Sequence, residues 1–204
     1  MTKRRNNIAF WAGMAVFLVA VLPMTQIVRN EYPFFAGYVI LQFIALAVAW
    51  TILGGYAGYV NFGTNAFFGV GVYTAVALFK ATGAPLVVQI GVAAIVGMLL
   101  GFGVGLLTLR MRGIFFSIAT IALAIIIETF VMNWRFVGGA AGIQLQRPPV
   151  TAPFDSYVKM LFFVQAVLVV IAVSIARYIQ NSRIGRGLQA LRDDELAAEC
   201  TGVP

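Results

Sequence analysis

The feature that most constrains this chain is the length of its apolar runs without charge. No charged residue occurs between Glu31 and Lys80, and another uncharged run extends from Ile8 to Val28. A helix needs about 20 apolar residues to cross the hydrocarbon core of a bilayer. Only 10% of the 204 residues are charged, against about 25% in a soluble domain. The bilayer is therefore the main solvent of this chain.

The run between Glu31 and Lys80 is too long for one crossing and long enough for two. Glycines at 54, 55, 58 and 63 mark the expected break between them. Irregular backbone at this depth is tolerated only where it is buried in protein or lines a cavity. The six expected spans are Ile8–Val28, Phe35–Gly55, Asn65–Phe79, Leu86–Leu109, Ile114–Trp134 and Tyr157–Ile179.

The basic residues predict the orientation of the spans. With six spans both termini lie on one side, and that side carries nine of the 14 Lys and Arg residues. Cytoplasmic loops are enriched in Lys and Arg, so both termini are expected in the cytoplasm. The nine are Lys3, Arg4, Arg5, Arg110, Arg112, Arg177, Arg183, Arg186 and Arg192, and the other five are Arg29, Lys80, Arg135, Arg147 and Lys159.

The sequence thus predicts an all-α, polytopic membrane helix bundle of about six transmembrane helices. Its transmembrane domain covers residues 1–180 and a cytoplasmic segment covers 181–204. The net charge of +7 is interpreted as a topology signal and as contact with membrane lipid headgroups, without a role in binding nucleic acid.

Several kinds of chemistry are excluded by missing residue types. The chain has no histidine and one cysteine, Cys200. A His- or Cys-based metal site, an internal disulfide and a Ser-His-Asp triad therefore cannot form. The phosphate-binding pattern G-x-x-x-x-G-K-[ST] is also missing. We expect no enzymatic activity, no metal and no cofactor.

Glu128 is the one ionisable residue deep in an expected span. A charge at a helix centre costs about 3 kcal/mol in insertion experiments. Ser117, Thr120 and Ala124 share its helix face by steps of three and four residues, so this face points at protein or water. Two interpretations stay open, a residue that lines a pathway and a structural contact between helices. The candidate pathway residues are Asn61, Thr64, Asn65, Thr120 and Glu128.

The C-terminal segment predicts a helix-turn-helix at the membrane surface. Ser182 can cap a first helix that runs to Arg192, and Asp193 or Asp194 can cap a second over residues 195–200. Gly202 and Pro204 would end the second helix. The segment is either an amphipathic anchor or a docking element for a cytoplasmic partner.

Two stretches resemble the branched-chain amino acid permease family of ABC importers. Residues 55–74 are similar to a signature of that family, and residues 182–203 are similar to its cytoplasmic coupling motif. Residues 112–120 and 138–143 add support, and the resemblance extends from about Gly37 onward. It implies a permease subunit in the bacterial inner membrane that carries branched-chain or related amino acids. It also implies two cytoplasmic ABC ATPases, a second permease subunit and an external substrate-binding protein.

The resemblance assigns roles to individual residues. It places an acidic residue at Glu128, and it assigns the ATPase coupling surface to Gly185, Arg186, Glu195, Ala197, Ala198 and Gly202. The small residues among them, Gly185, Ala197, Ala198 and Gly202, would let the partner approach closely.

The chain departs from the family pattern at two places. Thr64 stands where family members commonly carry a histidine. Family members also continue past the position of Pro204 with further spans. A fragment, a truncated product or spans supplied by another chain are therefore the expected explanations.

Two other functions remain open at this stage. The first is a secondary carrier that uses Glu128 as a proton relay; the coupling-like tail and the lack of a second ionisable residue deep in a span argue against it. The second is a truncated subunit that assembles with a transporter without forming a pathway. Leucine, isoleucine, valine, other amino acids, urea and short amides are all compatible with the resemblance.

Overall fold

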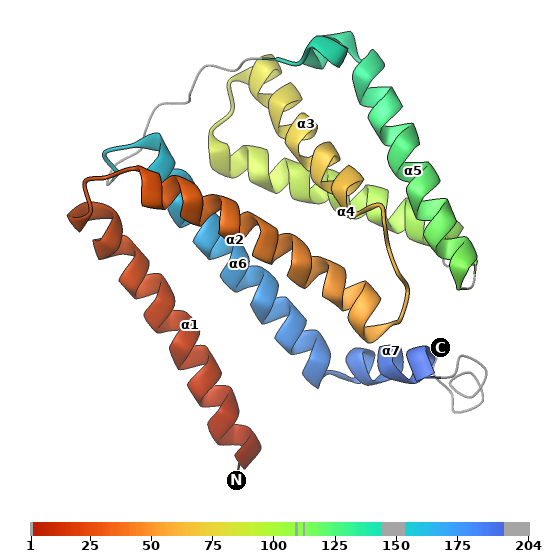
Figure 1. The fold of residues 1–204 in the computed structure, drawn as a ribbon, viewed down its shortest axis with the longest axis horizontal. Coiled ribbons are helices and arrows are strands. Elements are labelled where there is room, and N and C mark those ends of the chain that lie inside the picture. The colour runs from red at the N-terminus through yellow and green to blue at the C-terminus, as the bar shows by residue number, and fades with distance from the viewer. Residues whose placement is uncertain (1, 109, 112, 144–153, 194–204) are drawn as a thin grey trace. The chain divides into compact units, whose positions relative to one another are not determined.

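A computed structural model describes the chain except residues 1, 109, 112, 144–153 and 194–204, and it describes residues 2–7 by their backbone alone. The described residues form helices and contain no strand (Figure 1). The helices are α1 Thr2–Ile27, α2 Tyr32–Thr51, α3 Thr64–Thr82, α4 Leu86–Thr108, α5 Ile114–Asn133, α6 Tyr157–Asn181 and α7 Arg183–Asp193. A π-helical turn, η1 (Ile52–Tyr56), extends α2, and two 3-10 turns, η2 (Arg135–Val137) and η3 (Gly139–Ala141), follow α5. The predicted all-α class is confirmed.

Five stretches of helix are long and apolar enough to cross a membrane, within the part of the chain that is described. They are Ile8–Ile27, Tyr32–Tyr56, Leu86–Thr108, Ile114–Asn133 and Tyr157–Asn181, and each matches one of the six expected spans. The remaining expected span forms α3, which is helical over 19 residues but is less apolar. Thr64, Asn65 and Lys80 lie at its two ends, which explains the lower hydropathy.

The chain forms two compact units. The first contains residues 1–52 and 149–187, and the second contains residues 53–148 and 188–204. In the first unit α2 packs along α6, and α1 also contacts α6 (Figure 1). Its core is built from Val21, Phe34, Leu41, Phe162, Ala166 and Val169.

Phe34 and Phe162 fix the contact between α2 and α6. Their rings meet edge to face with centroids 5.4 Å apart, a favourable arrangement for aromatic pairs. Gly37 permits this approach, because a Cβ there would lie 2.6 Å from the Phe162 ring. The buried Lys159 places its Nζ 5.6 Å above the Phe34 ring. A cation over an aromatic face is stabilised by the ring's electrons.

In the second unit α3 packs against both α4 and α5. Near the end of α3, Lys80 Nζ donates a 2.7 Å hydrogen bond to the Phe136 carbonyl in the turn after α5. The same ammonium lies 4.9 Å from the centre of the Phe136 ring. Many large apolar side chains face outward, among them Val87 and Ile114 at 81% and 77% exposure. Such a surface suits lipid and not water.

Candidate functional site

The predicted break between the second and third expected spans is present. After the π-helical turn that ends at Tyr56, the chain is irregular from Ala57 to Gly63, and α3 begins at Thr64. We call residues 57–63 the connecting segment. Gly58 has a φ of +76°, a left-handed conformation that glycine adopts without steric cost.

The connecting segment is hydrogen-bonded to the first half of α5. Ser117 Oγ donates a 2.9 Å hydrogen bond to the Val60 carbonyl. The Phe62 amide donates to Thr120 Oγ1 at 3.2 Å. These two bonds satisfy backbone groups that no helix satisfies, which is a strict requirement in an apolar environment. The Tyr59 ring also meets the Phe116 ring edge to face at 5.0 Å.

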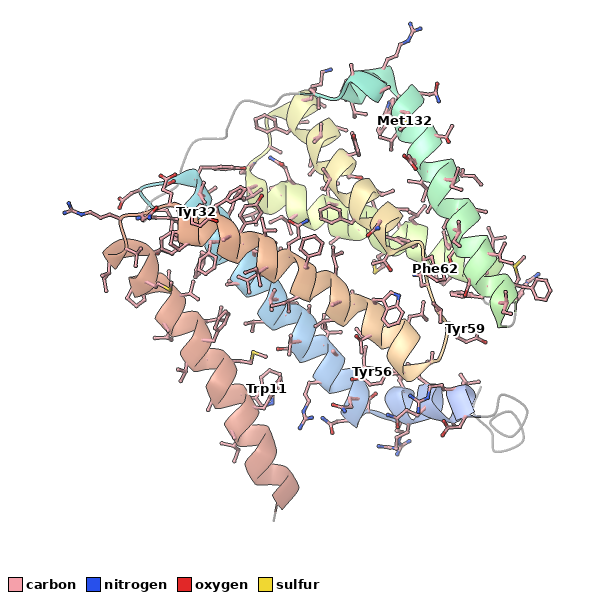
Figure 2. All side chains as sticks on the ribbon, viewed as in Figure 1. Trp11, Tyr32, Tyr56, Tyr59, Phe62 and Met132 are labelled. Atoms are coloured by element: carbon pink, nitrogen blue, oxygen red, sulfur yellow. The ribbon has the colours of Figure 1, made fainter. Side chains whose placement is uncertain are left out.

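A local turn then starts α3. Asn61 Oδ1 accepts a 2.7 Å hydrogen bond from the Gly63 amide, a turn that Asn forms readily. Gly63 is buried, and a Cβ there would lie 3.1 Å from the Thr120 carbonyl. The small residue therefore lets the beginning of α3 approach the middle of α5. Figure 2 shows Tyr59 and Phe62 on the connecting segment and Met132 near the far end of α5.

A cavity of about 340 Å³ lies between α3 and α5. Its polar side chains are Asn65 and Tyr73 from α3 and Glu128 from α5. The small or apolar remainder is Ala66, Gly69, Ala124, Ile127, Val131 and Met132. Asn65 and Tyr73 are eight residues apart on α3, which places both on one helix face. We call this space the Glu128 cavity.

The structure separates the five candidate pathway residues into two groups. Asn65 and Glu128 line the Glu128 cavity. Asn61 and Thr120 form the hydrogen bonds of the connecting segment, and Thr120 is only 2% exposed. Thr64 is the first residue of α3 and is not among the lining residues.

Two features of the cavity were not predicted from the sequence. Glu128 lies five residues before Asn133, the end of α5, which is about 8 Å at the helical rise of 1.5 Å per residue. It therefore lies about midway between the centre of the span and this end. Tyr73 was missed, although the spacing Asn65, Gly69, Tyr73 in steps of four residues carried the signal.

The predicted first helix of the C-terminal segment is confirmed as α7. Ser182 Oγ accepts a 3.2 Å hydrogen bond from the Gly185 amide and donates a 2.7 Å bond to the Ile179 carbonyl. The predicted cap by Ser182 is therefore correct. Gly185 is buried, and a Cβ there would overlap the Ile179 carbonyl. Glu195, Ala197, Ala198 and Gly202 lie outside the described residues.

The last turn of α7 contacts the chain between Gly55 and Gly58 in the second unit. We call residues 55–58 the helix break. Arg192 Nη1 donates a 3.0 Å hydrogen bond to the Gly55 carbonyl. Gly58 leaves room for this side chain, because a Cβ there would lie 2.7 Å from Arg192 Cγ. A displacement of this turn of α7 would therefore act directly on the connecting segment.

Among the described residues, no group of three or more Asp, Glu, His or Cys side chains could hold a metal ion. The cavity chemistry rests instead on one carboxylate, one amide and one phenol.

Comparison with known proteins places these features in context. The family described as "Branched-chain amino acid transport system / permease component" matches residues 32–204. Two curated relatives, from Escherichia coli (strain K12) and Salmonella typhimurium (strain LT2), are named "High-affinity branched-chain amino acid transport system permease protein LivM". Each is 24% identical to this chain over 220 residues, which cover 92% of this chain and 51% of the relative. The chain thus spans about half the length of the curated relatives it matches. No solved structure matches it significantly.

Proposed function

Because the chain belongs to the family of branched-chain amino acid transport system permease components, we propose that it is a membrane subunit of an ATP-driven importer. It carries part of the pathway for branched-chain or related amino acids across the bacterial plasma membrane. The observation that carries this proposal is the convergence of Asn65, Tyr73 and Glu128 on one cavity inside the matched region.

The chemistry of the Glu128 cavity supports passage of a small amphipathic solute. Its volume of about 340 Å³ lies within the range of small-molecule sites, roughly 300–1,000 Å³. The Glu128 carboxylate complements an ammonium group, and the Asn65 amide and Tyr73 hydroxyl add hydrogen-bonding capacity. The remaining lining is small or aliphatic, which suits an aliphatic side chain.

The energy for transport comes from partners in this proposal. Two cytoplasmic ABC ATPases dock on α7 and the residues that follow it, and a second permease subunit completes the pathway. An external substrate-binding protein delivers the amino acid. Both termini lie in the cytoplasm. Closure of the ATPase pair would move α7, and the bond from Arg192 to the Gly55 carbonyl would pass that movement to the helix break.

The connecting segment would then carry the movement to α5. Its hydrogen bonds to Ser117 and Thr120 lie two to three turns before Glu128 on the same helix. Rigid helices joined by short hydrogen-bonded contacts are a physical route for coupling. A shift of the segment would change the width of the Glu128 cavity.

One observation favours a second candidate function. A carboxylate in a membrane cavity is also suited to proton relay, so a secondary carrier that uses Glu128 is the alternative. A further alternative is a subunit that assembles with a transporter without conducting solute. The secondary carrier predicts uptake driven by a proton gradient, and the non-conducting subunit predicts uptake that survives deletion of this chain.

Affinity purification tests the assembly. The full-length chain, tagged at its N-terminus, is purified in mild detergent from membranes of its native host, and bound proteins are identified by mass. We expect an ATPase with a phosphate-binding loop and a second permease. The double variant Ala198→Glu/Gly202→Glu should lose the ATPase and keep the permease.

A matched control adds two carboxylates on the side predicted to face outward. The double variant Ala81→Glu/Ala140→Glu changes two exposed residues and should retain every partner. A wild-type chain that brings down no ATPase would overturn the proposal.

A further inference from the structure

A second cavity, of about 610 Å³, lies in the first unit where α1, the end of α6 and the beginning of α7 come together. Its basic side chains are Arg177, Arg183 and Arg186. Trp11 lines it from α1, and Tyr178 and Asn181 line it from α6. Among the described residues that line it, none is acidic. We call it the arginine cavity.

Among the described residues of the helices that line this cavity, the acidic side chain is Asp193, the last residue of α7. It lies seven residues after Arg186, about 10 Å along the helix, and pairs with Arg192 at 3.6 Å. Asp155 lies just before α6 begins at Tyr157, whereas Arg177 lies near its other end at Asn181. The helix advances 20 residues from Tyr157 to Arg177, about 30 Å, far beyond the Debye length of about 8 Å. The Arg177 guanidinium donates to Gln180 Oε1 at 3.1 Å and lies 5.4 Å over the Phe10 ring. The described lining thus presents three guanidinium groups to an anion that enters the cavity.

Arginine side chains favour phosphate as that anion. The planar guanidinium presents paired N–H donors that match two phosphate oxygens at once. Asn181 and Ser182 add neutral polar atoms to the lining, which suits the glycerol or hydroxyl part of a headgroup.

The surroundings of the cavity indicate that this phosphate belongs to a lipid. Trp11 and Tyr178 are 51% and 72% exposed, and such amphipathic rings settle at the headgroup level of a bilayer. The helices that lead away from the cavity present bare apolar side chains, including Val16 on α1 at 68% exposure and Ile175 on α6 at 49%. A soluble phosphate would leave this apolar surface uncovered, whereas the two acyl chains of a phospholipid would cover it.

We propose that the arginine cavity binds the phosphate headgroup of an anionic phospholipid from the leaflet on the side of both termini. Basic cavities between membrane helices on the cytoplasmic side are suited to such headgroups. The site gives Arg186 a role beside the ATPase contact expected from sequence. It does not rest on the transport function, so either proposal can fail while the other stands.

Lipid binding to the purified full-length chain tests this site. Dioleoyl phosphatidylglycerol and dioleoyl phosphatidylcholine are titrated separately in detergent, and bound lipid is counted by native mass spectrometry. The wild-type chain should bind the anionic lipid at least about tenfold more tightly. The double variant Arg183→Gln/Arg186→Gln should weaken that binding by about 30-fold, since each Arg near a membrane surface contributes about 1 kcal/mol.

A charge-matched control separates the site from the overall charge of the protein. Arg29→Gln/Arg135→Gln also removes two positive charges, at positions outside the cavity, and should leave phosphatidylglycerol binding within about twofold of wild type. The single variant Arg186→Gln, which disturbs the fold less, should show about fivefold weaker binding. Equal melting temperatures of all variants in phosphatidylcholine would show that the fold is retained.

Three results would overturn the proposal. One is an equal loss of phosphatidylglycerol binding in the control and the cavity variant, which would assign the effect to diffuse charge. Another is equal affinity of the wild-type chain for the two lipids. The third is displacement of the lipid by glycerol phosphate at the concentration at which phosphatidylglycerol itself competes, which would make a soluble phosphate the ligand.

Discussion

Replacing Gly58 by alanine should break the contact between α7 and the helix break. The new Cβ would lie 2.7 Å from Arg192 Cγ, well inside the normal carbon separation of about 3.5–4.0 Å. Arg192 would have to rotate away, and its hydrogen bond to the Gly55 carbonyl would be lost. The backbone itself would also be strained, because φ is +76° at this position.

The magnitude follows from these two effects. A left-handed conformation costs a residue with a Cβ about 1–2 kcal/mol. A hydrogen bond from a charged donor contributes about 1.5–3 kcal/mol when it is buried. The Arg192 side chain is 52% exposed, so about 1 kcal/mol is the appropriate figure here. Gly58→Ala should therefore destabilise the chain by about 2–3 kcal/mol.

A double-mutant cycle isolates the contact. Arg192→Ala should cost about 1 kcal/mol in the wild-type background and almost nothing in the Gly58→Ala background, because the bond is already broken there. The assay is unfolding of the purified full-length chain by denaturing detergent in mixed micelles, followed by circular dichroism. Gly83→Ala is the matched control, since Gly83 has a φ of +64° and nothing within 4 Å of the added Cβ.

The control should show backbone strain alone and add to Arg192→Ala without coupling. An equal loss of unfolding free energy from Arg192→Ala in the wild-type and Gly58→Ala backgrounds would contradict this prediction. That result would mean that Arg192 and the helix break do not share a contact.

Three further substitutions test other parts of the account. Thr120→Val should destabilise the chain by about 1–3 kcal/mol, because a backbone amide in the connecting segment loses its acceptor; Thr129→Val, whose hydroxyl bonds only within α5, should cost less in the same unfolding assay. Glu128→Gln should lower uptake by the assembled transporter at least about tenfold, and unchanged uptake would remove the carboxylate from the pathway. Gly185→Ala should displace α7 from the Ile179 carbonyl and weaken ATPase capture in the affinity purification; full retention would show that this close contact has no part in coupling.

The membrane spans were predictable because lipid imposes a simple rule on sequence. Long uncharged runs must be helical, since backbone groups in hydrocarbon have no water to bond. Five expected spans therefore match stretches that are long and apolar enough to cross a membrane. The Ser182 cap was also predictable, because a hydroxyl three residues before a buried backbone amide is a local signal.

The contacts of the connecting segment were not predictable in the same way. The glycines indicate where the helix stops, but the partners of the freed backbone groups lie 57 and 58 residues away at Ser117 and Thr120. The bond from Arg192 to Gly55 spans 137 residues. One sequence carries no periodic signal for such pairs, because they depend on how separate helices pack.

The candidate site shows the same division. Asn65 and Glu128 were identified as polar residues in apolar surroundings, and they do line one cavity. Thr120 was selected by the same argument, yet its hydroxyl bonds the connecting segment instead. Polarity in a span indicates that a side chain needs a partner, and only the fold shows whether that partner is backbone or an open cavity.

Energy-dependent uptake tests the central claim most directly. The full-length chain is purified from its native host together with its partners and reconstituted into liposomes with the external binding protein, and uptake of radiolabelled leucine, isoleucine and valine is measured. We predict uptake that requires ATP on the side of the ATPases, persists without a proton gradient and falls sharply in Glu128→Gln. Uptake driven by a proton gradient without ATP would contradict it and assign Glu128 to a secondary carrier.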